Sequence, residues 1–323
     1  MQIVILDGYT ANPGDLSWKP LESLGQLTVY DRTASADIIA RSAQADIVIT
    51  NKTVLTADIL RKLPKLKFIS LLSTGTNAVD LSAARILEIP VANVPGYSTP
   101  SVAQMTFALI QELALGVGLH ARDVRQGGWT VSSDFCYWKQ PLLELSGKTL
   151  GIIGYGAIGR EVEKIAYAYG MKVLIHSRTR PAEIEDSRWC SLEEILPKAD
   201  ILTLHCPLTH QNAELINKNS LAKMKQKTLL INTARGGLIN EADLAYALNS
   251  NMIGGAGLDV LSTEPPEAGN PLLTAKNCLI TPHIAWASQE ARKRLLETVV
   301  DNLKGFIQGC PVNIVNGKDG KEI

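Results

Sequence analysis

The sequence predicts an α/β protein of two domains, each built on a doubly wound parallel sheet. Short apolar runs alternate with amphipathic stretches over the first hundred residues, and the alternation restarts near Lys148. This pattern is typical of parallel strands joined by crossover helices. The length of 323 residues suits two domains, since one domain usually takes roughly 100–200 residues. A hydrophobic content of 46% supplies apolar side chains for two cores.

The first domain is expected to start at the N-terminus with a sheet of short strands. The apolar runs at 2–6, 27–30, 47–50, 68–72 and 91–93 are predicted strands. Residues 56–63 and 80–87, which lie between them, have helical periodicity. Residues 98–119 are predicted to form one long helix, which Ser98 or Thr99 could cap and whose first turn accommodates Pro100.

The second domain repeats the alternation after an irregular stretch. Its predicted strands are 149–153, 172–175, 201–204, 228–231, 255–260 and 278–281, with helices at 158–169, 192–196 and 241–248. Asn240 is a suitable N-cap for the last of these helices. Residues 288–308 form a final predicted helix, and the tail is expected to return to the first domain. The predicted domains are therefore 1–98 plus 288–323, and 99–287.

The irregular stretch 127–146 is rich in aromatic residues, including Trp129, Phe135 and Trp138. Such a segment either packs on its own domain or reaches a partner subunit. The second interpretation is favoured because aromatic side chains often anchor interfaces, and local packing remains the alternative.

The composition excludes several classes of protein. Lys and Arg number 32, as do Asp and Glu, so the formal net charge is zero, which argues against a general nucleic-acid binder. The five cysteines are widely spaced, so we expect a reducing compartment and neither a metal site nor a disulfide framework. We expect no signal peptide and no membrane span, because the chain starts on a predicted strand and polar residues interrupt the apolar stretch 102–119. The resulting prediction is a cytoplasmic location.

A glycine-rich turn predicts a dinucleotide site. The strand at 149–153 runs directly into Gly154-x-Gly156-x-x-Gly159, and a helix follows. In this context the glycines allow a tight turn, close approach of a pyrophosphate and close helix–strand packing. The helix N-terminus, with Ala157 and Ile158, offers free N–H groups to the anion. A glycine turn without a ligand is the alternative.

The end of the next strand bears on the choice of dinucleotide. An NAD site usually has an acidic residue there for the ribose 2′-OH, but this chain has His176, Ser177 and Arg178, with no carboxylate before Glu183. Ser177 and Arg178 could bind a 2′-phosphate. The sequence therefore favours NADP(H), or dual use of NAD(P)(H), although solvated loop arginines are the alternative.

Polar motifs after later strands complete a family resemblance. NTARGG occurs at 232–237, LDVLSTEPP at 258–266 and ITPHIAWAS at 280–288. With LSTGTNAVD at 72–80, VPGYSTPSVAQ at 94–104, GYGAIG and LHCPLT, they resemble the D-2-hydroxyacid dehydrogenase family over nearly the whole chain. The resemblance implies a flavodoxin-like substrate domain and a Rossmann cofactor domain with a cleft between them, and a homodimer.

The family's catalytic Arg, Glu and His fall on Arg235, Glu264 and His283. Reduction of a 2-keto acid requires groups that hold a carboxylate, polarise a carbonyl and supply a proton. The planar guanidinium of Arg235 can bind the carboxylate and carbonyl oxygens of the substrate. The imidazole of His283 can transfer the proton. A hydrogen bond from Glu264 would orient the imidazole and favour its protonated form. The alternatives are a phosphate-binding arginine, a loop carboxylate and a structural histidine.

The resemblance also implies further ligand contacts. In the cofactor domain these are His205, Cys206, Pro207, Thr233, Ala234 and, toward the nicotinamide carboxamide, Asp259. In the first domain the backbone N–H groups of Gly75 and Thr76 are expected to meet the substrate carboxylate. Asn51 and Lys52 are substrate candidates only because they follow a predicted strand.

The string DFCYW at 134–138, together with HIAWAS, is similar to the glycerate dehydrogenase branch of the family. The predicted reaction is hydroxypyruvate to D-glycerate, with glyoxylate as a second substrate. The alternatives are another 2-keto acid, such as 3-phosphohydroxypyruvate, and a non-enzymatic nucleotide-sensing corepressor of the same fold.

Overall fold

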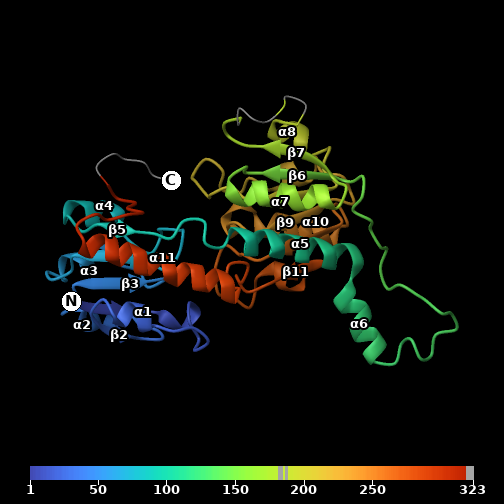
Figure 1. Cartoon of the computed structure of the whole chain (residues 1–323). Helices are drawn as coiled ribbons and strands as arrows, with labels where there is room; N and C mark the ends of the chain where they lie inside the picture. Colours follow the sequence, from blue (N-terminus) through green and yellow to red (C-terminus); the bar gives the residue numbers. More distant parts are fainter. Residues whose placement is uncertain (181–184, 186–187, 318–323) are drawn as a thin grey trace. The chain divides into compact units, whose positions relative to one another are not determined.

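The computed structural model describes residues 1–180, 185 and 188–317. The chain divides into two compact units, Met1–Ser98 with Ala287–Ile323, and Thr99–Trp286 (Figure 1). Each predicted strand overlaps a strand of the described chain to within one or two residues at either end. The predicted fold class, two parallel-sheet α/β units, is confirmed.

The first unit has a parallel sheet in the order β2-β1-β3-β4-β5, which is the flavodoxin-like arrangement. Its strands are β1 Gln2–Ile5, β2 Gln26–Val29, β3 Ile47–Thr50, β4 Phe68–Leu71 and β5 Val91–Ala92. Its helices are α1 Lys19–Glu22, α2 Ile38–Ser42, α3 Ala57–Arg61, α4 Leu81–Ile86 and α11 Gln289–Ile307, with 3-10 turns η1 Gly8–Thr10 and η2 Ser35–Asp37.

The C-terminal part of the chain belongs to this first unit. Phe306 of α11 stacks on Phe68 with ring centroids 4.5 Å apart. The chain after α11 then runs along the outer edge of β5, where Val315 N donates to Val91 O across 2.8 Å. Arg292, which is 8% exposed, forms a two-pronged ion pair with Asp15. These contacts fasten α11 to the N-terminal sheet.

The second unit has a parallel sheet in the order β11-β10-β9-β8-β6-β7. Its strands are β6 Thr149–Ile153, β7 Lys172–His176, β8 Ile201–Leu204, β9 Leu229–Asn232, β10 Gly255–Leu258 and β11 Cys278–Ile280. Its helices are α5 Thr99–Leu115, α6 Val117–Arg125, α7 Ala157–Ala168, α8 Leu192–Ile195, α9 Lys218–Leu221 and α10 Glu241–Asn249, with η3 Gly236–Leu238 and η4 Pro271–Thr274.

Both faces of this sheet are buried, and successive strand residues divide between two cores. Ile152 packs in the core that contains α5 and α7, whereas the next residue, Ile153, packs in the core that contains α8 and α10. This alternation follows from the two-residue repeat of a strand. The strand order changes direction between β6 and β8, and open α/β sheets bind ligands at the carboxyl ends of strands at such a point.

The prediction of a single helix over 98–119 is wrong. Helix α5 ends at Leu115, and α6 starts at Val117 after a bend of 57°. Gly116, between them, has φ +58, a left-handed conformation that glycine adopts at little cost. The Gln140 side chain packs against this glycine and donates to Leu113 O. The break turns α6 and the following segment away from the sheet of their unit (Figure 1).

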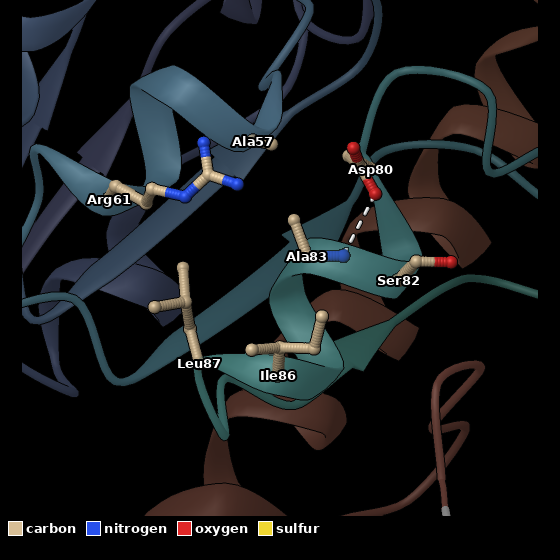
Figure 2. A pocket seen from close by; sticks show the side chains of 7 residues that line it. All are labelled: Ala57, Arg61, Asp80, Ser82, Ala83, Ile86 and Leu87. Atoms are coloured by element: carbon tan, nitrogen blue, oxygen red, sulfur yellow. Dashed lines mark hydrogen bonds between the residues drawn. The ribbon is translucent and has the colours of Figure 1, made fainter.

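Two further features of the described chain concern its surface. A hollow of ≈ 210 Å³ lies between α3 and α4. Figure 2 shows the side chains of Arg61, Ile86 and Leu87 that help to line it. None of the predicted site residues lines it.

Within the described residues, no single helix has the length and apolarity needed to cross a membrane, although the bent pair α5 and α6 passes that test together.

Candidate active site

The turn after β6 has the geometry that a pyrophosphate requires. Gly154 has φ +94, and a Cβ there would collide with the Cys206 backbone. Gly159 is buried, and a Cβ there would collide with Gly154 O. A Cβ on Gly156 would instead meet no atom within 4 Å, so the space beside this residue is open to a phosphate. Helix α7 begins here without a side-chain cap, which leaves first-turn N–H groups for an anion.

The segment after β8 lies against this glycine turn. His205 N donates to Ile153 O across 2.7 Å, and the Cys206 backbone contacts Gly154. Asn212 Nδ2 donates to Pro207 O across 2.8 Å and holds the segment closed. The structure therefore brings the predicted residues 205–207 beside the predicted glycines.

The His205 imidazole is unusual within this segment. The residue retains some exposed surface, but both ring nitrogens are buried and have no hydrogen-bond partner among the described residues. Burial lowers the pKa of His205 to about 3, because the charged form loses hydration. This histidine is therefore neutral in the folded protein at physiological pH.

A backbone hydrogen bond joins the end of β7 to the glycine turn. His176 O accepts from Gly154 N across 2.8 Å, and His176 Nδ1 contacts Cys190 O across 2.9 Å. Ser177 Oγ donates to Thr179 O, and Arg178 is exposed. Glu183, the first carboxylate after the strand, lies outside the described residues.

Arg235 stands on a turn that a buried asparagine shapes. Asn232, at the end of β9, is fully buried, donates to Arg235 O across 2.8 Å and accepts from Ala234 N across 3.0 Å. Thr233 Oγ1 contacts Thr106 Oγ1 of α5 across 3.1 Å. Arg235 itself is exposed, and its Nη1 donates to Ala234 O. The turn thus presents a guanidinium at the carboxyl end of the sheet.

Gly236 brings the Arg235 turn into contact with the loop that carries Glu264. A Cβ at Gly236 would overlap the backbone of Leu261 and Ser262, so the two loops pack main chain to main chain. Any larger residue at this position must separate them.

Glu264 and His283 form a direct pair. His283 Nδ1 lies 2.6 Å from Glu264 Oε2, while Glu264 Oε1 accepts from Leu261 N across 3.1 Å. The two side chains keep 28% and 33% of their surface exposed. His283 has φ +54, a region that non-glycine residues enter rarely and often at functional sites. A carboxylate on Nδ1 leaves Nε2 to exchange a proton with a ligand.

Asp259 holds the loop that carries His283. Its carboxylate is 1% exposed and accepts three hydrogen bonds, from Thr281 Oγ1 and from the backbone N–H groups of Ile284 and Ala285. Burial raises the pKa of Asp259, although these donors oppose the shift. The side chain therefore holds the His283 loop in place, and its predicted contact with the nicotinamide carboxamide stays a prediction.

The first unit places its predicted residues in two turns. Asp7, which sequence reasoning missed, accepts from the backbone N–H groups of Asn51, Lys52 and Thr53. Asn51 is 5% exposed and its amide donates to Thr10, so the structure uses this side chain internally. Lys52 is exposed, and the substrate contacts of both residues stay predictions.

Gly75 and Thr76 lie in the turn after β4. Ser73 Oγ donates to Gly75 O, and Thr74 Oγ1 donates to Val94 O across 2.7 Å. Within the described part of the chain, neither Gly75 N nor Thr76 N donates a hydrogen bond. Two such N–H groups suit a carboxylate ligand.

Two residues that build the site, Asn232 and Gly236, are absent from the predicted site residues, and both shape the arginine turn. Their signal in the sequence is position alone, because Asn232 ends the buried strand β9 and Gly236 lies in the turn that follows it. Within the described residues there is no cluster of three or more potential metal-ligating side chains.

A glycine turn at the switch point of a parallel sheet, with an imidazole–carboxylate pair and an arginine at later strand ends, is the arrangement of a dinucleotide-dependent oxidoreductase. Residues 107–285 match the family model described as D-isomer specific 2-hydroxyacid dehydrogenase, NAD binding domain. The chain belongs to this family and uses a nicotinamide cofactor.

Relatives cover nearly the full chain. Hydroxypyruvate reductase from Blautia hydrogenotrophica is 50% identical over 321 residues, which are 98% of this chain and 100% of the relative. Glycerate dehydrogenase from Methylorubrum extorquens is 43% identical over 281 residues, 86% of this chain and 88% of the relative. A solved acyclic imino acid reductase, in complex with NADPH and D-Arg, is 30% identical with a TM-score of 0.85, covering 98% and 100% of the two chains.

Proposed function

We propose that this enzyme reduces hydroxypyruvate to D-glycerate, with glyoxylate as a second substrate. The observation that carries the proposal is the 2.6 Å contact between His283 Nδ1 and Glu264 Oε2, in a chain 50% identical to a hydroxypyruvate reductase. The pair provides an oriented proton donor beside the loop that carries Arg235.

Each residue then has a separate task. The nicotinamide cofactor, when bound, supplies the hydride in the reductive direction. Arg235 binds the substrate carboxylate and keto oxygen through its planar fork. His283 gives a proton from Nε2 to the keto oxygen, and Glu264 fixes the ring and stabilises its positive charge.

A substrate panel tests the proposal. Steady-state reduction of hydroxypyruvate, glyoxylate, pyruvate and 3-phosphohydroxypyruvate is measured with the purified enzyme. We expect the highest kcat/KM for hydroxypyruvate. A higher value for 3-phosphohydroxypyruvate would reject the substrate assignment, and full activity in His283→Ala would reject the mechanism.

The proposed cofactor is NADPH, or NADPH and NADH together. Ser177 and the exposed Arg178 follow β7 where NAD-specific sites carry a carboxylate. The solved relative with NADPH has the same fold. Arg178→Ala is expected to weaken NADPH binding by about tenfold, the value of one charge-assisted contact, and to leave NADH unchanged. Lys172→Ala, which replaces an exposed lysine at the start of β7, is the control.

We also propose a homodimer assembled through residues 127–146. Within the described residues this segment has no helix or strand, and several of its large apolar side chains are exposed, with Phe135 at 88% and Trp138 at 65%. Exposed apolar side chains of this size typically mark an interface.

The cytoplasmic location remains a proposal as well. It is supported by five free cysteines, of which Cys136 and Cys310 are exposed, because exposed thiols persist in a reducing compartment. Cell fractionation followed by detection of the enzyme is the test, and recovery from the membrane or the medium would contradict it.

A further inference from the structure

A buried glutamate on α7 lies outside every motif described so far. Glu163 is 8% exposed, and side chains from three places converge on its carboxylate. Tyr155 donates to Oε2, Arg188 donates to Oε1, and Tyr167 also donates to Oε1 across 3.2 Å. A buried carboxylate is costly without such partners, so this cluster is a specific arrangement of the fold.

The partners of Glu163 belong to two parts of the nucleotide site. Tyr155 lies between Gly154 and Gly156 in the glycine turn, and its ring is covered by the Arg160 guanidinium at 4.5 Å. The glycine turn is therefore fastened to α7 through a side chain as well as through the backbone.

Arg188 lies where the chain returns after the stretch that begins at Ser177. Ile175 N donates to Arg188 O, and Cys190 N donates to Ile175 O, each across 2.8 Å. These bonds make a short parallel bridge between Trp189 and β7. Arg188 thus lies beside the end of β7, and Glu163 links it to α7.

We propose that Glu163 is a positioning residue for the adenosine end of the cofactor and that it supports preference for the 2′-phosphate. The inference rests on the proposed assignment of His176, Ser177 and Arg178 to the cofactor. Through Tyr155, Glu163 holds the glycine turn, and through Arg188 it holds the chain that pairs with Ile175, next to the end of β7 from which Ser177 and Arg178 follow. Groups that are held in place before a ligand binds lose less conformational freedom on binding. The Arg188 guanidinium is bound to Glu163, whereas Ser177 and the exposed Arg178 follow β7, where the 2′-phosphate is expected.

The test is direct binding of NADPH and NADH by isothermal calorimetry to wild type and Glu163→Gln, with kcat measured at saturating cofactor. Loss of a charged hydrogen bond corresponds to roughly a tenfold change, so we expect the NADPH Kd to rise about tenfold and the NADH Kd about two- to threefold. The kcat should stay unchanged. Tyr167→Phe is the matched control, because it removes one contact to Glu163 from within the same helix, and both Kd values should stay at wild type.

Arg188→Gln removes the other partner of the Glu163–Arg188 ion pair. The Arg188 side chain is 27% exposed, so this variant remains informative if Glu163→Gln does not fold. The double variant should bind NADPH no more weakly than the weaker-binding single variant, because each change breaks the same Glu163–Arg188 ion pair. Equal weakening of NADPH and NADH, or additive losses in the double variant, would overturn the inference while leaving the proposed function intact. A wild type that binds neither cofactor would overturn both.

Discussion

Glu264 divides its two carboxylate oxygens between the imidazole of His283 and the backbone of Leu261. Glu264→Gln keeps a hydrogen-bond acceptor but removes the negative charge that stabilises the protonated ring. We expect kcat for keto-acid reduction to fall by about 100-fold, the lower range for general acid catalysis, with little change in KM. Steady-state kinetics measure this.

Glu267→Gln is the matched control, since Glu267 is an exposed carboxylate of the same loop. Wild-type kcat in Glu264→Gln would show that the pair has no part in proton transfer.

His205 makes the stability of the fold depend on pH. The folded histidine has a pKa of about 3 against a reference of 6.5, so the unfolded chain binds more protons between these values. The free energy of unfolding therefore falls as the pH falls below 6.5, by about 1.4 kcal/mol per pH unit. In His205→Leu, the loss between about pH 7.5 and 5 should be smaller by roughly 2 kcal/mol.

Urea denaturation at the two pH values measures this difference. His210→Gln is the control, because His210 is exposed and its replacement should leave the pH dependence unchanged. An equal acid loss in wild type and His205→Leu would mean that the buried ring does not contribute.

At the scale of elements, the strands were predictable because a buried parallel strand is a short continuous apolar run. The break at Gly116 was not, because a lone glycine within an apolar helical pattern does not show which conformation it takes. Similarly, the glycine motif was readable from spacing, whereas the roles of Gly236 and Asp259 depend on which loops become neighbours in space. Spacing along the chain therefore predicted the candidate ligand groups better than the groups that support them.

The contact between the arginine loop and the glutamate loop gives a prediction for an element. In Gly236→Ala the added methyl group overlaps the Leu261–Ser262 backbone, so the loops must move apart and Arg235 shifts relative to Glu264. We expect kcat/KM for the keto acid to fall about 100-fold, as a misplacement of about 1 Å can cause. The cofactor Kd should change little, because the glycine turn after β6 is untouched.

Gly269→Ala is the matched control on the same long loop, since a Cβ there meets no atom within 4 Å. Equal activity of both variants would show that the close approach at Gly236 does not position the site.

At the scale of the whole molecule, residues 127–146 raise the question of why exposed rings are held in a defined place. Tyr137 Oη and Lys139 Nζ bind the Asp123 carboxylate of α6 across 2.5 and 2.9 Å, and these partners lower the pKa of Asp123. Trp129 Nε1 donates to Phe135 O. Polar contacts thus order the segment, while Phe135 and Trp138 remain exposed. An ordered apolar surface that its own unit does not cover is the geometry expected of an interface.

The double variant Phe135→Ser/Trp138→Ser should therefore weaken the proposed dimer. Burial of one large apolar side chain is worth about 1.5–3 kcal/mol. Losing two from each subunit therefore removes at least about 6 kcal/mol and should raise the dimer dissociation constant by about 10,000-fold or more. Sedimentation velocity over a concentration series measures this constant. Tyr246→Ser is the control, because Tyr246 is 68% exposed on α10 and its loss should leave the dimer unchanged. A double variant as dimeric as the wild type would place the interface elsewhere on the protein. A wild type that sediments as a monomer would reject the dimer and favour local packing of the segment.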